Sequence, residues 1–278
     1  MGAKADEYLE INRASWNKRV ASHYQSEFYD VASFLRGKTS LNSIEAALWP
    51  NLQGKKVLHL QCHFGQDTLS LARLGADVLG VDLSDKAIAQ AHALNEACKL
   101  KARFICCDIY SLEEHLDEQF DLVFSSYGTI GWLPDLEKWA NLIARYLKPG
   151  GQLVFAEFHP VLWMYDNDFK KIEYSYFKAD PIIEKEQGTY AAKEEEIEIE
   201  TVSWNHSLAE VLGSLRQTGL QLDTFQEFDY SPYNCFANMV EIAPSRFQIK
   251  GMEAKLPMVY ALVAVKEKPL SARLSRRF

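Results

Sequence analysis

Several features that define other protein classes are missing from this chain. It has no apolar stretch long enough to span a bilayer, and residues 1–10 are charged and lack the apolar core of a secretory leader. Basic residues are also few, because 30 Lys and Arg stand against 38 Asp and Glu and give a formal net charge of -8. Proteins that bind a phosphate backbone concentrate Lys and Arg instead. The composition favours a cytoplasmic protein without a membrane span and disfavours nucleic acid as a partner.

Cysteine is scarce as well. The 5 cysteines are odd in number and have no paired spacing, which disfavours a disulfide framework or a zinc ribbon. His59, Cys62 and His63 lie near one another in the sequence, but no fourth residue has the spacing of a metal ligand. We expect reduced thiols and no metal site.

What the sequence does contain is an alternation of apolar runs and helical patterns between residues 57 and 157. This alternation is typical of an α/β fold with an open, doubly wound, mainly parallel sheet. Ser84 is a typical helix N-cap, and Gly75 is a typical C-cap. The predicted strands are residues 56–62, 76–83, 102–109, 120–127 and 152–160. The predicted helices are 67–75, 84–100 and 136–148, and the last of them is followed by a Pro-Gly-Gly stop at 149–151.

The pattern changes after Pro160. Residues 161–204 alternate like strands and contain turn residues and aromatics, which predicts an antiparallel insertion over the active site. In the stretch EEIEIE at 195–200, glutamates and isoleucines face opposite ways on a strand, so a half-solvated ribbon is favoured over an acidic binding patch. A helix is predicted at 207–219, and it is followed by two closing strands that we expect to be antiparallel, at 220–231 and 258–267.

The predicted domain organisation has three parts. Residues 1–45 are rich in aromatics and predict a helical N-terminal cap over a cofactor site. Residues 46–268 form the main domain, with the insertion at 161–204. Residues 269–278 end in a basic stretch and predict a flexible tail.

Ligands of an open parallel sheet bind beyond the carboxyl ends of its strands. Asp82 ends the second predicted strand about twenty residues beyond the first turn, where a carboxylate can accept both hydroxyls of a ribose. The alternative role of Asp82, a helix cap, is already filled by Ser84. Asp82 therefore predicts a nucleoside ligand.

The first turn, residues 61–65, narrows the choice of cofactor. A dinucleotide needs glycines where its pyrophosphate approaches the backbone, and this turn has side chains at Gln61 and His63. S-adenosylmethionine carries no phosphate and fits better. Histidine tolerates positive φ, so we expect His63 in a left-handed conformation. We expect Gly65 where the helix approaches a strand closely.

The order of these segments resembles the class I S-adenosylmethionine-dependent methyltransferases, and in particular the subgroup whose first motif is LQCHFGQDTLSLARLGA, residues 60–76. The likeness covers residues 57–160, continues through 204–220, and includes the cap segment WNKRVASHY. It implies a seven-stranded sheet whose last strand is antiparallel. Family members usually carry an acidic residue at the position of His59 and glycines at those of Gln61 and His63.

The resemblance also implies a set of cofactor contacts. The first turn faces the methionyl part, Asp82 the ribose, and Asp108 with Ile109 the adenine, while Ser125 follows the fourth strand beside the methionyl group. The complete expected set is Trp16, Gln61, Cys62, His63, Gly65, Thr68, Asp82, Leu83, Asp108, Ile109 and Ser125.

The expected reaction is methyl transfer to a small or medium-sized molecule, by a monomer or a homodimer. His159 follows the fifth strand and titrates near neutrality, so it is a candidate general base that Glu157 would orient, with Tyr127 beside the substrate. The alternative for His159 is a hydrogen bond that holds the insertion closed. Two other functions stay open. One is a non-catalytic methyltransferase-like binding module, and the other is an NAD(P)-dependent oxidoreductase.

Overall fold

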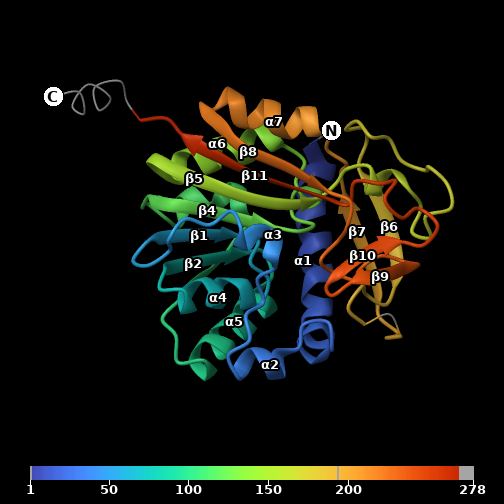
Figure 1. The fold of residues 1–278 in the computed structure, drawn as a ribbon, viewed down its shortest axis with the longest axis horizontal. Coiled ribbons are helices and arrows are strands. Elements are labelled where there is room, and N and C mark those ends of the chain that lie inside the picture. The colour runs from blue at the N-terminus through green and yellow to red at the C-terminus, as the bar shows by residue number, and fades with distance from the viewer. Residues whose placement is uncertain (1, 193, 269–278) are drawn as a thin grey trace.

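The structure is a computed structural model, and it describes residues 2–192 and 194–268. Its centre is one sheet of seven strands, which are β1 (Lys56–Leu60), β2 (Asp77–Asp82), β3 (Arg103–Cys106), β4 (Phe120–Ser126), β5 (Leu147–Phe158), β8 (Leu220–Phe228) and β11 (Val259–Lys266). Their order is β3-β2-β1-β4-β5-β11-β8. The first five strands run parallel, and β11 is antiparallel to both of its neighbours. The predicted open sheet with an antiparallel last strand is confirmed (Figure 1).

Four helices pack along the sheet, namely α4 (Gln66–Arg73), α5 (Asp85–Ala97), α6 (Leu136–Tyr146) and α7 (Leu208–Gln217). Successive residues of β1 face opposite sides of the sheet. Leu58 is in one apolar cluster with Trp139 of α6, whereas Val57 is in another with Leu71 of α4. The strands are therefore buried on both faces, as expected for a parallel sheet.

The predicted helix ends agree with the structure in most places. Ser84 accepts a hydrogen bond from the Ala87 amide at 3.0 Å, so it caps α5 as predicted. The helix predicted before the Pro-Gly-Gly stop at 149–151 ends slightly earlier than the stop, because α6 ends at Tyr146 and residues 147–151 already belong to β5. Pro149 cannot donate an amide hydrogen and so cannot continue a helix.

The N-terminal segment contains α1 (Gly2–Gln25), α2 (Val31–Leu35) and α3 (Ser43–Ala46). Helix α1 is held by segments far away in the sequence. The Asn12 amide group donates to the Val202 carbonyl at 2.8 Å and accepts from the Val202 amide at 2.9 Å. At its other side, Asn17 donates to Asp85 at 2.7 Å. Helix α1 therefore bridges the start of α5 and the strand that contains Val202.

Two hairpins lie beyond the central sheet (Figure 1). Strands β6 (Ile182–Gln187) and β7 (Glu198–Ser203) pair antiparallel inside the predicted insertion, and Ile199 is buried while Glu198 and Glu200 are exposed. The first part of the insertion contains the short helix η3 (Leu162–Met164) and loops. The second hairpin, β9 (Met239–Ala243) with β10 (Arg246–Ile249), was not predicted.

Two further short helices complete the described fold, η1 (Ile109–Glu114) and η2 (Ile130–Trp132). Among the described residues, no helix combines the length and apolarity needed to cross a bilayer. The tail predicted at 269–278 lies outside the described residues.

Candidate ligand site at the carboxyl ends of the strands

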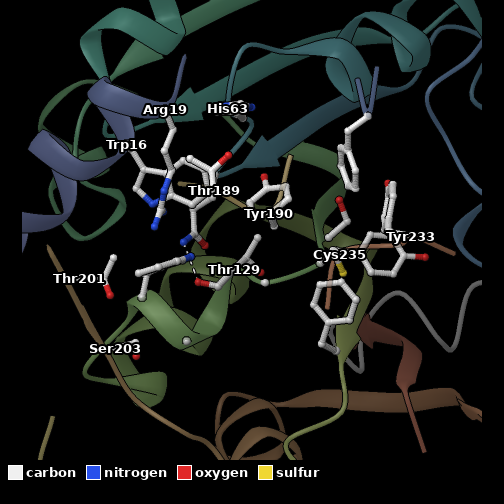
Figure 2. A pocket seen from close by; sticks show the side chains of 18 of the residues that line it. Trp16, Arg19, His63, Thr129, Thr189, Tyr190, Thr201, Ser203, Tyr233 and Cys235 are labelled. Carbon is white, nitrogen blue, oxygen red and sulfur yellow. Dashed lines mark hydrogen bonds between the residues drawn. The ribbon is translucent and has the colours of Figure 1, made fainter. Parts of the chain in front are cut away.

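A cavity of about 1050 Å³ opens at the carboxyl ends of β1, β2 and β4. Its wall is completed by α1, by the β6–β7 hairpin and by residues near 233–237 (Figure 2). The cavity brings together segments that are distant in the sequence, as expected for a site beyond the strand ends. Of the residues predicted to bind cofactor or substrate, those that line it are Trp16, Gln61, Cys62, His63, Gly65, Asp82, Leu83, Asp108, Ile109 and Tyr127.

The first turn adopts an unusual backbone conformation. Gln61 has φ 55°, His63 has φ 50° and Gly65 has φ 80°, so all three are left-handed. The expectation for His63 is confirmed, and Gln61 joins it at a cost on the order of 1–2 kcal/mol per non-glycine residue. A Cβ on Gly65 would lie 2.8 Å from the Phe104 ring, which confirms the predicted close approach. The turn thus keeps the shape of a glycine-rich turn with only one glycine.

The two side chains that replace glycines are held by specific contacts. The Gln61 amide nitrogen donates to the Thr129 carbonyl at 2.8 Å, and this ties the end of β1 to the loop after β4. The His63 ring packs against Trp16 and His23, with ring centroids 5.4 and 5.3 Å away. Burial lowers the pKa of His63 well below its usual range, so the ring is neutral.

Asp82 lies beside this turn at the end of β2. Its Oδ2 accepts a hydrogen bond from the His63 amide at 2.7 Å, and its Oδ1 accepts one from the Ser84 amide at 2.9 Å. Burial raises the pKa of Asp82 to about 6, although these backbone bonds oppose the shift. A carboxylate has about four acceptor positions. Each oxygen of Asp82 can therefore accept one more hydrogen bond from a ligand in the cavity.

The two residues expected to contact adenine line the cavity, but two other residues expected to contact the cofactor do not. Asp108 and Ile109 line it where η1 begins. Thr68 is buried, and its hydroxyl lies 2.8 Å from Nδ1 of His59. Ser125 donates to the Thr129 hydroxyl at 3.0 Å. These two polar side chains are therefore used inside the protein.

Glu157 anchors a loop instead of orienting a base. Its carboxylate accepts backbone hydrogen bonds from Gly128, from Thr129 at 2.7 Å, from Ile130 at 3.2 Å and from Phe158 at 2.7 Å. Burial raises the pKa of Glu157 in spite of these bonds. The predicted contact with a catalytic histidine is wrong, because the oxygens of Glu157 are turned to the loop after β4.

His159 does not line the cavity. Its Nε2 lies 3.0 Å from Oε1 of Glu227 on β8, and its Nδ1 accepts from the Val161 amide at 3.2 Å. Burial lowers the pKa of His159, and Glu227 opposes that shift. This geometry does not support the predicted general base. It agrees better with the alternative of a residue that hydrogen-bonds the insertion, because Val161 is the first residue of 161–204, and Glu227 on β8 is an additional partner.

Tyr127 is the predicted catalytic candidate that reaches the cavity. It is left-handed with φ 47°, a strained conformation for an aromatic residue. Its hydroxyl donates to Oε2 of Glu45 at 2.6 Å. Glu45 is fully buried, and burial raises its pKa to about 7. Glu45 was not predicted as a site residue, although the spacing from Asn42 to Glu45 is that of a capping box, which α3 forms.

Other residues of the cavity wall were also missed, and a local signal existed for one of them. Arg19 lies one helical turn beyond Trp16, so helical spacing could have placed it on the same face. The remaining missed residues that line the cavity include Tyr29, Asp67, Thr129, Tyr190 and Tyr233. In the part of the chain that the structure describes, no group of three or more His, Cys, Asp and Glu is arranged to hold a metal ion.

Comparison with known proteins adds a match in sequence. Residues 57–151 match a family model described as a methyltransferase domain. The ubiquinone biosynthesis O-methyltransferase of Pseudomonas fluorescens strain SBW25 is 35% identical over 108 residues, which are 38% of this chain and 45% of that protein. An uncharacterized protein of Haemophilus influenzae is 31% identical over 155 residues, 52% of this chain and 61% of that protein. The chain spans less than two thirds of either relative.

Comparison of structures extends the likeness to nearly the whole chain. The S-adenosylmethionine-dependent methyltransferase of Clostridium acetobutylicum is 18% identical, with a TM-score of 0.56. The alignment covers 96% of this chain and 98% of that one. The likeness concerns the fold, and the present chain has the class I methyltransferase fold.

Proposed function

We propose that this chain transfers a methyl group from S-adenosylmethionine to a small or medium-sized acceptor. The single observation that carries the proposal is the position of Asp82. Its carboxylate faces a large cavity at the end of β2 and has acceptor positions left for the two hydroxyls of a ribose. The methyltransferase-domain match over residues 57–151 supports the same conclusion.

The residues around Asp82 fit the rest of that cofactor. The first turn has the backbone shape of a cofactor-binding turn, but the side chains of Gln61 and His63 stand where a pyrophosphate would approach. A phosphate-free cofactor does not need that surface. Asp108 and Ile109 line the same cavity beyond Asp82 and would face the adenine.

When bound, the cofactor would supply a methyl group on a positively charged sulfur, and its thioether would leave as the acceptor takes the methyl group in line. The protein then has to align the two molecules and exclude water. Trp16 and Trp132 pack edge to face, with ring centroids 5.5 Å apart, at the wall of the cavity. Their rings provide apolar surface that helps to exclude water.

Tyr127 and Glu45 are our candidates for handling the acceptor's proton. An acceptor oxygen or nitrogen that hydrogen-bonds to the Tyr127 hydroxyl can give up its proton as its lone pair forms the bond to the methyl carbon and the carbon–sulfur bond breaks. Tyr127 passes its own proton to Glu45 along the 2.6 Å hydrogen bond. The pKa of Glu45, raised by burial to about 7, suits a proton acceptor near neutral pH.

The remaining parts of the proposal are a cytoplasmic location, a monomeric or homodimeric state, and membership of the subgroup with the first motif LQCHFGQDTLSLARLGA. All five cysteines are free thiols, which is consistent with a reducing compartment. The left-handed Gln61 and His63 are consistent with the subgroup motif.

Calorimetry with two cofactors tests the proposal. We expect S-adenosylhomocysteine, the demethylated product, to bind the purified protein and raise its melting temperature, because a ligand of the native state adds about 2.7 kcal/mol of stability at 100 times its Kd. We expect no binding of NAD⁺ under the same conditions. Binding of NAD⁺ without binding of S-adenosylhomocysteine would favour the oxidoreductase alternative. Cofactor binding without methyl transfer to any of a wide range of acceptors would favour the non-catalytic module.

A further inference from the structure

Arg19 is a buried cation on the cavity wall whose one ion pair among the described residues is long (Figure 2). Its side chain is 5% exposed. The nearest carboxylate oxygen is Oε2 of Glu186, 3.9 Å from Nη2, and the Glu186 side chain is 35% exposed. Within the described part of the chain, the buried Nε of Arg19 has no hydrogen-bond partner. A charged group in this position still has donors to offer to a ligand.

Burial of this guanidinium is unfavourable for the empty protein. Desolvation lowers the pKa of Arg19, although Tyr190, Glu186 and Tyr29 oppose the shift. A buried charge usually has a partner, because the loss of its hydration is costly. The guanidinium carbon lies 4.8 Å from the centre of the Trp16 ring and 5.7 Å from that of Trp132. These cation–π contacts compensate in part, but they do not provide an acceptor for the buried N–H of Nε.

Two neutral histidines lie beside Arg19, and we refer to Arg19, His23 and His63 as the Arg19 cluster. The rings of His23 and His63 have centroids 5.3 Å apart. Both ring nitrogens of His23 and Nε2 of His63 are buried without a partner among the described residues. Burial, together with the charge of Arg19, lowers the pKa of both rings, that of His23 to about 3. Each neutral ring carries one N–H that it can donate.

The donor set of the cluster is suited to one kind of group. A guanidinium presents N–H donors in a planar fork that matches the two oxygens of a carboxylate. The neutral imidazoles add further donors without adding charge. Because His63 belongs to the first turn and its amide binds Asp82, the cluster adjoins the position expected for the cofactor.

We propose that Arg19 binds a carboxylate of a molecule held in the cavity, with His63, which also lines the cavity, as a neutral hydrogen-bond donor beside it. This inference rests on the proposed function, and the carboxylate can come from two sources. One is the amino-acid end of the cofactor, and the other is an acidic group on the methyl acceptor.

Two nucleosides distinguish the sources. S-adenosylhomocysteine carries the carboxylate, and 5′-methylthioadenosine has the same nucleoside and thioether but lacks the amino-acid end. The test compares their affinities by calorimetry in the wild type, in Arg19→Gln and in Arg13→Gln. Arg13 is a matched control because it lies on the same helix, is half exposed and pairs with Glu10. Arg13→Gln should change neither affinity by more than about twofold.

If the carboxylate belongs to the cofactor, Arg19→Gln should weaken S-adenosylhomocysteine at least tenfold and leave 5′-methylthioadenosine within about twofold. If it belongs to the acceptor, both nucleosides should bind Arg19→Gln normally. Benzoate, used as a simple carboxylate probe, should then bind the S-adenosylhomocysteine-saturated wild type and not the saturated variant. The proposal is overturned if neither nucleoside affinity nor benzoate binding depends on Arg19.

A melting experiment without ligand excludes a purely structural role. Because the charge of Arg19 is compensated only in part by Glu186 and the two tryptophans, we expect Arg19→Gln to melt at the wild-type temperature or above it. Lower stability together with parallel losses for both nucleosides would show that Arg19 supports the fold, and would also overturn the proposal. If the wild type binds neither nucleoside, the proposed function is wrong, and benzoate binding to the ligand-free protein alone decides the role of Arg19.

Discussion

At the scale of single residues, the cavity wall differs from the rest of the protein in how its polar groups are satisfied. Glu157 uses its carboxylate to accept three backbone amides after β4 and that of Phe158 beside it, and it is a structural residue. Asp82 keeps acceptor capacity, and Arg19 keeps donor capacity, on the wall of the same cavity. Groups that the fold leaves partly unsatisfied are those that a ligand can complete.

Glu45 gives a prediction at this scale. Its pKa is about 7 in the folded protein, because burial raises it and the neighbouring Asp67 raises it further, against a value of 4.5 for an ordinary Glu. Between these values the folded state binds a proton that the unfolded state does not. The contribution of Glu45 to the free energy of unfolding is therefore greatest below pH 4.5 and falls as the pH rises to about 7, by about 3 kcal/mol.

Chemical unfolding of the wild type and of Glu45→Gln between pH 5 and pH 8 measures the contribution of Glu45 to the free energy of unfolding. The stability of the wild type relative to the variant should decline by about 2–3 kcal/mol over that range. Other titrating groups, including the buried histidines, are common to both proteins and cancel in the difference. A difference that stays constant with pH would mean that Glu45 is not protonated in the folded state.

At the scale of elements, periodicity in the sequence predicted those parts of the fold that local interactions determine. The parallel strands β1 to β5 and the capped helices between them follow from apolar runs and from residues such as Ser84. The β9–β10 hairpin was missed because its residues were assigned to a loop between the two closing strands. The sequence Met239–Ala243, a short turn at Pro244 and Arg246–Ile249 could have indicated it.

Helix α1 gives a prediction at this scale. Asn12 joins it to β7 by two buried hydrogen bonds to the backbone of Val202. Asn12→Ala leaves those two backbone groups without partners, and we expect a loss of stability on the order of 1–3 kcal/mol. Because these bonds join α1 to β7, amide hydrogen exchange should accelerate in both elements together. Helix α1 also carries Trp16 and Arg19 of the cavity wall.

Asn141→Ala is the control for this change. Asn141 donates to the Glu137 carbonyl on the exposed side of α6, where water can replace it. Its replacement should alter stability by less than about 0.5 kcal/mol. Equal effects of the two substitutions, or faster exchange in β7 alone, would show that Asn12 does not hold the cap.

At the scale of the whole molecule, the sheet order decides where the site can form. In the order β3-β2-β1-β4-β5, the chain adds β2 and β3 on one side of β1 and then β4 and β5 on the other side. The carboxyl ends of β1, β2 and β4 therefore surround one cavity. Position after a strand was enough to predict Asp82, Tyr127 and the first turn. It was not enough for His159, because β8 supplies Glu227 as its partner, and this contact spans 68 residues of sequence.

The cavity wall opposite the strand ends could not be predicted from local sequence patterns either. Arg19, Tyr190 and Tyr233 come from α1, from the loop after β6 and from the region before β9, and no local pattern places them together. Which side chains of these segments face the cavity depends on long-range packing such as the contact of α1 with β7. The strand-end half of the site was therefore predictable, and the opposite half was not.

The binding of S-adenosylhomocysteine to the wild type, to Asp82→Ala and to Asp82→Asn tests the central claim most directly. If Asp82 holds the ribose, Asp82→Ala should lose on the order of 1–3 kcal/mol of binding free energy, because two ligand hydroxyls lose their acceptor. Asp82→Asn, which retains one acceptor oxygen, should lose less. Melting curves without ligand establish that both variants are folded. Calorimetry that gives the wild-type affinity for a folded Asp82→Ala protein would contradict the account, because the ribose would then have to lie elsewhere.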